Sequence, residues 1–173
     1  SGAENDCTAS ITLNPYSTET YRLRGLCRIR KSEFQGAIAD YEQVLKDYPS
    51  DEGALFNQAL CYLQIHKPDS ATLTADRLLN QAPKFYRAYM LKAQISLEQK
   101  DTINALRQID ALLALRPAEA SAWELKGQYA MQKGQYQLAD SLLTTAIRYE
   151  KGIYESFLLR AEARHALNQF GNA

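Results

Sequence analysis

The sequence has little proline or glycine, no excess of either charge and no long apolar run. Its 173 residues include five prolines and eight glycines, and Lys plus Arg equal Asp plus Glu at 20 each. This balance excludes a protein that binds nucleic acid or an anionic membrane through a basic surface. No stretch of about 18 apolar residues is present, which excludes a helix that spans a bilayer. The scarcity of helix breakers favours an all-α fold.

Residue patterns that would support chemistry are also missing. His66 and His165 lack the cysteine or carboxylate spacing that is typical of a metal site. The glycines are scattered singly, so no phosphate-binding loop is present, and no nucleophile elbow or carboxylate pair indicates catalysis. The sequence therefore predicts a protein that is not an enzyme and needs no cofactor or metal.

A 34-residue period is the strongest signal in the sequence. Four prolines that would each end a helix share this spacing: Pro15, Pro49, Pro83 and Pro117. Two rows of small residues keep the same step: Ala3, Ala37, Ala71, Ala105, Ala139, Ala173, and Gly25, Ala59, Ala93, Gly127, Ala161. Two rows of large residues do likewise: Tyr21, Leu55, Tyr89, Trp123, Phe157, and Leu45, Leu79, Leu113, Ile147. Such rows predict helices that stack closely in repeating units.

Each period encodes two helices. Apolar residues recur at three- and four-residue spacings over residues 18–31 and again up to about residue 48. Ser32 and Gln35 indicate a capping box for the second helix, and the Ser-Asp-Glu after Pro49 suits the start of the next repeat.

The repeat resembles the tetratricopeptide repeat family, whose pattern is W-x2-L-G-x2-Y, then A-x3-F, A and P over 34 residues. The matching residues are Trp123 and Gly127, Tyr21 and Gly25, then Ala37, Tyr41, Val44 and Pro49. The resemblance implies an all-α, right-handed superhelical solenoid of antiparallel helix pairs, with about ten helices. It also implies a concave surface, lined by the first helices of the repeats, on which peptides bind.

The period divides residues 1–173 into one predicted array. Residues 1–17 correspond to the second helix of a half repeat, and residues 154–173 to a partial repeat. The full repeats are 18–51, 52–85, 86–119 and 120–153. Neither end shows the polar capping element with which solenoids usually finish. We therefore expect a segment of a longer array, or self-association through the uncapped ends.

One row departs from the family pattern, which often has leucine there. The row consists of Arg24, Gln58, Lys92, Lys126 and Arg160. We expect the stems of these side chains to pack along the helix pairs while their heads reach water. Asp40 is the expected partner of Arg24.

The three cysteines fall on interior rows. Cys27 and Cys61 share one row, and Cys7 shares the row of Tyr41. We expect all three to behave as buried, unreactive thiols. A disulfide between Cys27 and Cys61 is left open, although equivalent residues of stacked repeats are generally too far apart for one.

The first helices provide the predicted partner surface. Its residues are Arg22, Leu26, Phe56, Asn57, Leu60, Arg87, Met90, Gln94, Glu124, Gln128 and Glu155. The first half is apolar, and Leu26, Phe56, Leu60 and Met90 are expected to form its exposed strip. The second half is polar and acidic, so we expect a partner segment that is apolar at one end and basic at the other. Ile29, Leu63 and Leu97 are expected instead to pack between adjacent repeats.

Some members of this family grip the acidic C-terminal tails of heat-shock chaperones with a clamp of five Lys, Asn and Arg side chains. Arg22, Asn57 and Arg87 match three of the five positions, whereas Leu26 and Leu91 stand at the other two. The sequence therefore does not favour this particular clamp.

The sequence predicts a non-catalytic scaffold that binds a peptide or partner protein in a concave groove, as a segment of a longer repeat protein. The alternative is a regulatory or assembly module of a larger multidomain protein, for example a bacterial envelope-associated or signalling protein. The compartment is open. Reduced thiols fit the cytoplasm, whereas a periplasmic or membrane-anchored protein with its anchor outside these residues would share the sequence.

Overall fold

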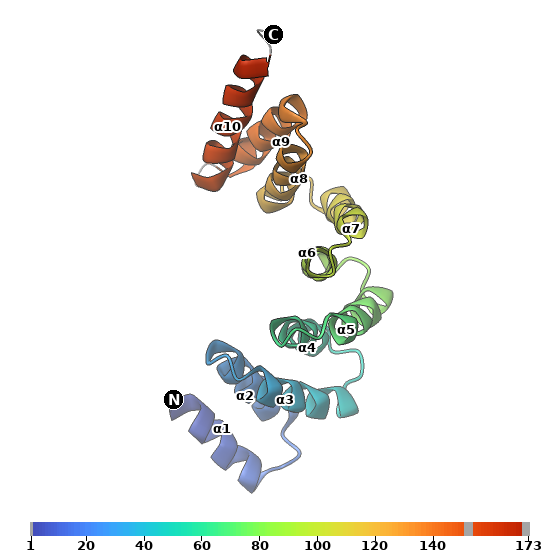
Figure 1. Cartoon of the computed structure of the whole chain (residues 1–173). Coiled ribbons are helices and arrows are strands. Elements are labelled where there is room, and N and C mark those ends of the chain that lie inside the picture. The colour runs from blue at the N-terminus through green and yellow to red at the C-terminus, as the bar shows by residue number, and fades with distance from the viewer. Residues whose placement is uncertain (1, 151–153, 171–173) are drawn as a thin grey trace. The chain divides into compact units, whose positions relative to one another are not determined.

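The computed structural model describes residues 2–150 and 154–170, and ten α-helices but no strand lie within them (Figure 1). They are α1 (Gly2–Leu13), α2 (Thr18–Arg30), α3 (Phe34–Asp47), α4 (Glu52–Gln64), α5 (Pro68–Gln81), α6 (Tyr86–Glu98), α7 (Thr102–Leu115), α8 (Ala120–Gln132), α9 (Tyr136–Tyr149) and α10 (Tyr154–Phe170). The first helices α2, α4, α6, α8 and α10 begin 34 residues apart. The prediction of an all-α fold with two helices in each period is confirmed.

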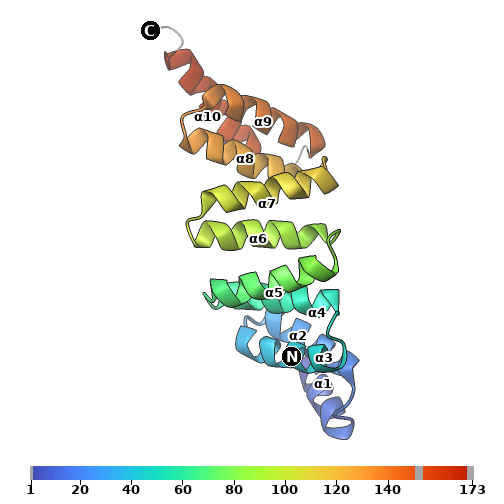
Figure 2. The same cartoon turned by 90° about the vertical axis from the view of Figure 1, so that its right-hand side faces the viewer.

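The chain divides into two compact units, Ser1–Ala105 and Leu106–Ala173. In the first unit each helix from α1 to α5 packs on the next one, and α4 also contacts α6. In the second unit α8 packs on α9, and α10 contacts both. Figure 2 shows neighbouring helices of each unit connected by short turns, as a stack of helix pairs requires. The division of residues 1–173 into one array of repeats stays a prediction.

The turn inside each repeat uses a residue with left-handed backbone conformation. Four such residues recur at the 34-residue step: Ser32 (φ 62°), His66 (φ 54°), Lys100 (φ 61°) and Gly134 (φ 69°). The amide that follows each of them donates to a carbonyl five residues earlier, as Glu33 N does to Arg28 O at 2.8 Å. This closure satisfies the last carbonyls of the first helix in each pair.

The capping box expected at Ser32 is therefore wrong. Helix α3 begins at Phe34, and Glu33 precedes it without a side-chain cap. Ser32 cannot supply the cap because its left-handed backbone closes α2, where its own N–H donates to Ile29 O at 2.9 Å. The start signal after Pro49 is confirmed, since Asp51 accepts a hydrogen bond of 2.6 Å from the N–H of Ala54.

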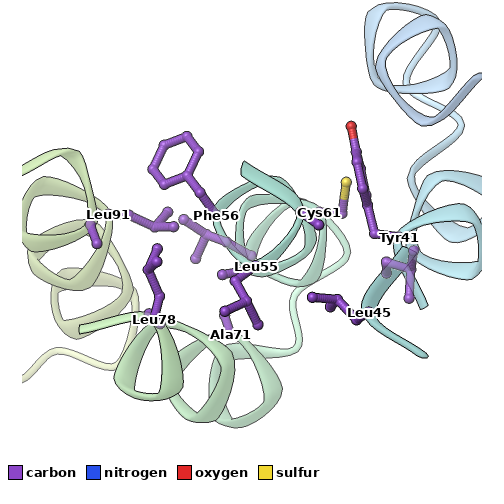
Figure 3. Close-up of a cluster of buried hydrophobic side chains, with 14 of the residues drawn as sticks. Tyr41, Leu45, Leu55, Phe56, Cys61, Ala71, Leu78 and Leu91 are labelled. Atoms are coloured by element: carbon purple, nitrogen blue, oxygen red, sulfur yellow. The ribbon is translucent and has the colours of Figure 1, made fainter. Parts of the chain in front are cut away.

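Small residues lie where paired helices cross. A Cβ atom on Gly25 would lie 2.9 Å from Cζ of Tyr41, and one on Gly127 would lie 2.6 Å from Cγ of Leu143. The α2/α3 and α8/α9 pairs therefore approach more closely than a larger residue permits. Figure 3 shows the corresponding core of the first unit, in which Leu55, Ala71 and Leu78 fill the space between α4 and α5.

Three cations of the row that departs from the family pattern form ion pairs with carboxylates. The expected pair of Arg24 with Asp40 is confirmed at 2.6 Å. Lys126 reaches Asp110 at 2.6 Å, and Lys92 reaches Asp76. The expectation that the heads of this row lie in water is wrong for Arg24, because Asp40 is 1% exposed and draws the guanidinium inward. It is also wrong for Gln58, which is 7% exposed and belongs to the buried face of α4.

Only one cysteine is buried as predicted. Cys61 is fully enclosed, and burial raises its pKa to about 12. Cys7 and Cys27 are half-buried, so the prediction of interior thiols is wrong for them. The reason is that α1 has no buried residue and covers the adjoining side of α2 only in part. All three thiols are free.

Candidate partner-binding surface

Eight of the predicted partner-binding residues lie on the first helices of the first unit, and we call them the first-helix set. They are Arg22 and Leu26 of α2, Phe56, Asn57 and Leu60 of α4, and Arg87, Met90 and Gln94 of α6. Leu26, Arg87 and Gln94 are exposed, and Arg22, Asn57, Leu60 and Met90 are half-buried. Phe56 is only 8% exposed, so its place in an exposed apolar strip is wrong.

Arg22 already has partners within the chain. Its guanidinium donates to Glu19 at 3.1 Å and to Asp51 at 2.5 Å. Burial alone would lower the pKa of Arg22, but the hydrogen bonds and charges of Glu19 and Asp51 raise it. Asp51 thus both caps α4 and neutralises the cation of α2. A partner's carboxylate would have to displace these groups, which are held in place by secondary structure.

Phe56 is buried because two side chains cover it, Phe85 at the end of the same repeat and Arg87 at the start of the next. Its ring centroid lies 5.5 Å from that of Phe85, and the guanidinium carbon of Arg87 lies 4.5 Å from its centroid. Phe85 also lines a pocket of about 550 Å³ between the start of α4 and the turn before α6. The pocket lining comprises Glu52, Ala82, Pro83, Lys84, Phe85 and Tyr86. Phe56 and Phe85 therefore support the Arg87 side chain, and the buried Phe56 ring is not itself exposed to a partner.

Arg87 differs from Arg22 in its electrostatic surroundings. Within the part of the chain that the structure describes, no carboxylate lies within ion-pairing distance of Arg87, and its one interaction is with the Phe56 ring. A guanidinium stacked on an aromatic face keeps its edge N–H groups available for acceptors. Leu91, at another position of the chaperone-tail clamp, is 2% exposed and contributes to the core.

The apolar residues that were expected to pack between repeats behave unequally. Leu63 is buried and Ile29 is half-buried, in line with that expectation. Leu97 is exposed, which contradicts it. The cause is the orientation of α6, whose core-facing residues are Ala88, Leu91 and Ile95. Leu97 therefore adds exposed apolar area on α6 that sequence reasoning had assigned to the interior.

The acidic part of the predicted surface belongs to the second unit. Glu124 on α8 accepts a hydrogen bond from Ser156 of α10, whose side chain is fully buried. Gln128 is half-buried, and Glu155 is exposed. Glu124 therefore helps to join two helices, and Glu155 is the more accessible carboxylate.

Sequence reasoning missed one set of contacts, in which Arg28 of α2 joins two other helices. Arg28 donates to Asp40 at 2.9 Å and to Glu4 at 3.4 Å, so that it joins three helices. Arg24 and Arg28 are four residues apart on α2, a spacing that puts two cations on one helix face. That spacing was a signal that they share a carboxylate.

Among residues 2–150 and 154–170, no three His, Cys, Asp or Glu side chains converge as metal ligands would. No helix in these two segments is long and apolar enough to cross a membrane.

Two family profiles described as tetratricopeptide repeat match residues 29–95 and 104–148, together about two thirds of the chain. The chain belongs to the tetratricopeptide repeat family. Proteins of this family are, in general, non-catalytic modules for protein–protein interaction, and family and fold together support that broad role here.

Curated relatives share short segments with this chain. It is 29% identical over 82 residues to the heat shock protein sti1 homolog of Schizosaccharomyces pombe, covering 47% of this chain and 14% of that protein. It is 25% identical over 182 residues to tetratricopeptide repeat protein 16 of Homo sapiens, covering 94% of this chain and 21% of that protein. The chain thus spans about a fifth or less of the length of these relatives.

The fold is also that of solved structures. YrrB, whose crystal structure is described as that of a TPR protein with an unusual peptide-binding site, aligns with a TM-score of 0.73 at 15% identity. The alignment covers 91% of this chain and 81% of that one. At this identity the likeness shows the fold alone, and it confirms the solenoid class predicted from the 34-residue period.

Proposed function

We propose that this chain holds a segment of a partner protein against α2, α4 and α6 of its first unit. The observation that carries the proposal is the combination on these helices of accessible apolar side chains with an accessible cation. Leu26 is 43% exposed, Leu60 and Met90 are half-buried, and Arg87 has no carboxylate partner among the described residues.

Each part of this set suits recognition of a peptide. Removing apolar area from water contributes about 25 cal/mol per Å². Met90 is unbranched and adapts to differently shaped side chains. Arg87 is held by the Phe56 ring, so less side-chain entropy is lost when it donates to an acceptor on the partner. The partner segment that fits is apolar, with a carbonyl or carboxylate near Arg87.

We further propose that the exposed carboxylate of Glu155, together with Glu124 and Gln128, receives a basic part of the partner. Glu155 carries most of this attraction, because Glu124 is engaged with Ser156. Charge reversal at Glu155 is therefore expected to weaken binding of a basic segment, and more strongly at low than at high salt.

We also propose that this chain is part of a longer protein, because the curated relatives are several times longer than their segments that align with it. The scaffold is then one segment of a repeat protein or the interaction module of a multidomain protein. Peptide binding by YrrB, the neighbour described with a peptide-binding site, supports the use of this fold for such a role.

The test is selection from a library of random peptides displayed on phage, followed by affinity measurement with purified variants. Leu26→Glu and Met90→Glu are each expected to weaken the selected peptides at least about tenfold, because a buried carboxylate would face an apolar segment. Leu73→Glu is the matched control, since Leu73 is 74% exposed on α5, a second helix of the same unit. Equal loss with all three variants, or loss with Leu73→Glu alone, would overturn the proposal.

A further inference from the structure

We propose that Cys7 and Cys27 form a disulfide that joins α1 to α2 when the chain meets a small-molecule disulfide such as oxidised glutathione. This site does not depend on the partner-binding role. It follows from the repeat positions of the two residues, from the contacts between their helices and from their accessibility.

The repeat places the two thiols opposite each other. Adding one period to Cys7 and Cys27 gives Tyr41 and Cys61, and Figure 3 shows the Cys61 sulfur beside the Tyr41 ring. Both belong to one buried cluster, and burial followed by the charge of Cys61 raises the pKa of Tyr41. Helix α1 packs on α2 as α3 packs on α4. From this equivalence we infer that Cys7 faces Cys27 as Tyr41 faces Cys61.

The contacts between α1 and α2 give the same register. Glu4 accepts from Arg28 at 3.4 Å, and the hydroxyl groups of Ser10 and Thr20 are 3.4 Å apart. The two helices run antiparallel through these contacts, which place position 7 opposite position 24. Cys27 lies three residues further along α2, on the same helix face. Burial, followed by the nearby charge of Cys27, raises the pKa of Cys7.

Accessibility separates this pair from the third cysteine. Cys7 and Cys27 are half-buried, whereas Cys61 is fully enclosed. Position 7 holds a cysteine, whereas the equivalent position 41 holds a tyrosine whose ring covers Cys61. Cys27 has no such ring beside it from position 7. A small oxidant can therefore reach the pair without opening the core, and Cys61 serves as an internal control.

The reaction balances as two thiol–disulfide exchanges. The thiolate of one cysteine attacks a sulfur of oxidised glutathione, which forms a mixed disulfide and releases one glutathione thiolate. The thiolate of the other cysteine then attacks the protein sulfur of that mixed disulfide and releases the second glutathione. Two protein thiols are oxidised, one glutathione disulfide is reduced, and the two protons pass to the released glutathione thiolates.

The cross-link would act on α1, a helix of the first unit that has no buried residue. Glu4 and Ser10 link it to α2 through polar contacts. A covalent bond in the middle of this interface would hold α1 on α2 even when the polar contacts open. The structure thus assigns to this pair a redox-dependent control of the first helix.

The experiment treats the whole chain with a mixture of reduced and oxidised glutathione, blocks the remaining thiols by alkylation and digests it with trypsin. We expect free thiols to fall from three to one, with Cys61 unmodified. Trypsin should release peptide 1–22, which contains Cys7, linked to peptide 25–28, which contains Cys27. Amide exchange in α1 should slow by roughly tenfold or more after oxidation, because the open state is constrained.

Two variants complete the test. Cys61→Ala should still form the link, whereas Cys27→Ser should give only a glutathione adduct on Cys7 and no slowing of α1 exchange. Separate glutathione adducts on Cys7 and Cys27 in the unaltered chain would overturn the proposal, and so would three intact thiols or a link to Cys61.

Discussion

Among single residues, Asp40 of α3 is a buried carboxylate that pairs with two cations of α2. It is 1% exposed, and it accepts hydrogen bonds from Arg24 at 2.6 Å and from Arg28 at 2.9 Å. The Asp40 hydrogen bonds raise the pKa of Arg24 despite its burial. A buried carboxylate between two cations is stable only while all partners are present.

Replacement of Asp40 by asparagine is therefore expected to destabilise the chain by about 3–5 kcal/mol, because two guanidinium groups lose their buried counter-charge. Asp110→Asn, which breaks the corresponding pair with Lys126, is expected to cost no more than about 1 kcal/mol, since its side chain is 61% exposed. Urea denaturation of both variants measures the difference. Equal losses of stability would show that Asp40 is not electrostatically required.

The left-handed residues that end the first helices have unequal backbone costs. Lys100 and Gly134 occupy equivalent positions with φ of 61° and 69°, yet only one of them is glycine. A residue with a Cβ atom in this conformation is strained by roughly 1 kcal/mol.

Lys100→Gly is expected to raise the free energy of unfolding by about 0.5–1 kcal/mol, and Gly134→Ala to lower it by about the same amount. Nothing lies within 4 Å of a Cβ placed on Gly134, so backbone conformation alone decides the sign there. Thermal unfolding of the two variants checks the prediction, which fails if both shift the midpoint in one direction.

Among the elements, α1 depends on a carboxylate more than on apolar burial. Glu4 pairs with Arg28 of α2 and with Lys31 of the turn that follows α2. The hydrogen bond from Lys31 lowers the pKa of Glu4 below its ordinary value of 4.5, against the effect of burial. A carboxylate with a lowered pKa in the folded state stabilises that state above its ordinary pKa. The stabilisation is lost as the pH falls through the lowered value.

Acidification below pH 4.5 is therefore expected to loosen α1 from α2 before it affects the other helices. Amide NMR spectra recorded from pH 7 downward should show the α1 signals changing first. Glu4→Gln should weaken α1 docking at neutral pH and remove this pH dependence. Glu33→Gln is the control, because Glu33 is 3.9 Å from the same lysine but half its side chain is exposed. A chain whose α1 signals follow the same pH course with and without Glu4 would contradict the assignment.

The elements are also where sequence reasoning worked best. The 34-residue step predicted where first helices begin and which small residues lie at crossings, since proline and glycine act through local backbone and steric rules. The prediction failed at Ser32, which could either end α2 with a left-handed backbone or cap the start of α3. The sequence does not show which of these two backbone conformations Ser32 adopts. The prediction also failed at Cys7, because the equivalent Tyr41 is buried by neighbours that the outer side of α1 lacks.

The candidate surface was predicted less completely than the fold. A first-helix position was correctly assigned to each residue, but exposure depends on contacts between repeats. Phe56 is covered by Phe85 and by Arg87 of the next repeat's first helix, and Arg22 is neutralised by Asp51. These partners lie 29 to 31 residues away in the sequence, beyond the range of helical periodicity.

For the whole molecule, family membership defines a scaffold whose specificity resides in variable side chains on a constant frame. Repeat proteins are stabilised mainly by contacts between neighbouring helices, which leaves one face of the first helices available. In this chain that face carries Leu26, Leu60, Met90 and Arg87. We propose that a partner segment binds there.

The most direct measurement is a methyl NMR titration of the leucine- and methionine-labelled chain with a peptide selected by binding. We expect the signals of Leu26, Leu60 and Met90 to shift as the peptide is added, while that of Leu73 on α5 stays in place. Shifts confined to Leu73 and other residues of the second helices, with the α2, α4 and α6 signals unmoved, would contradict it.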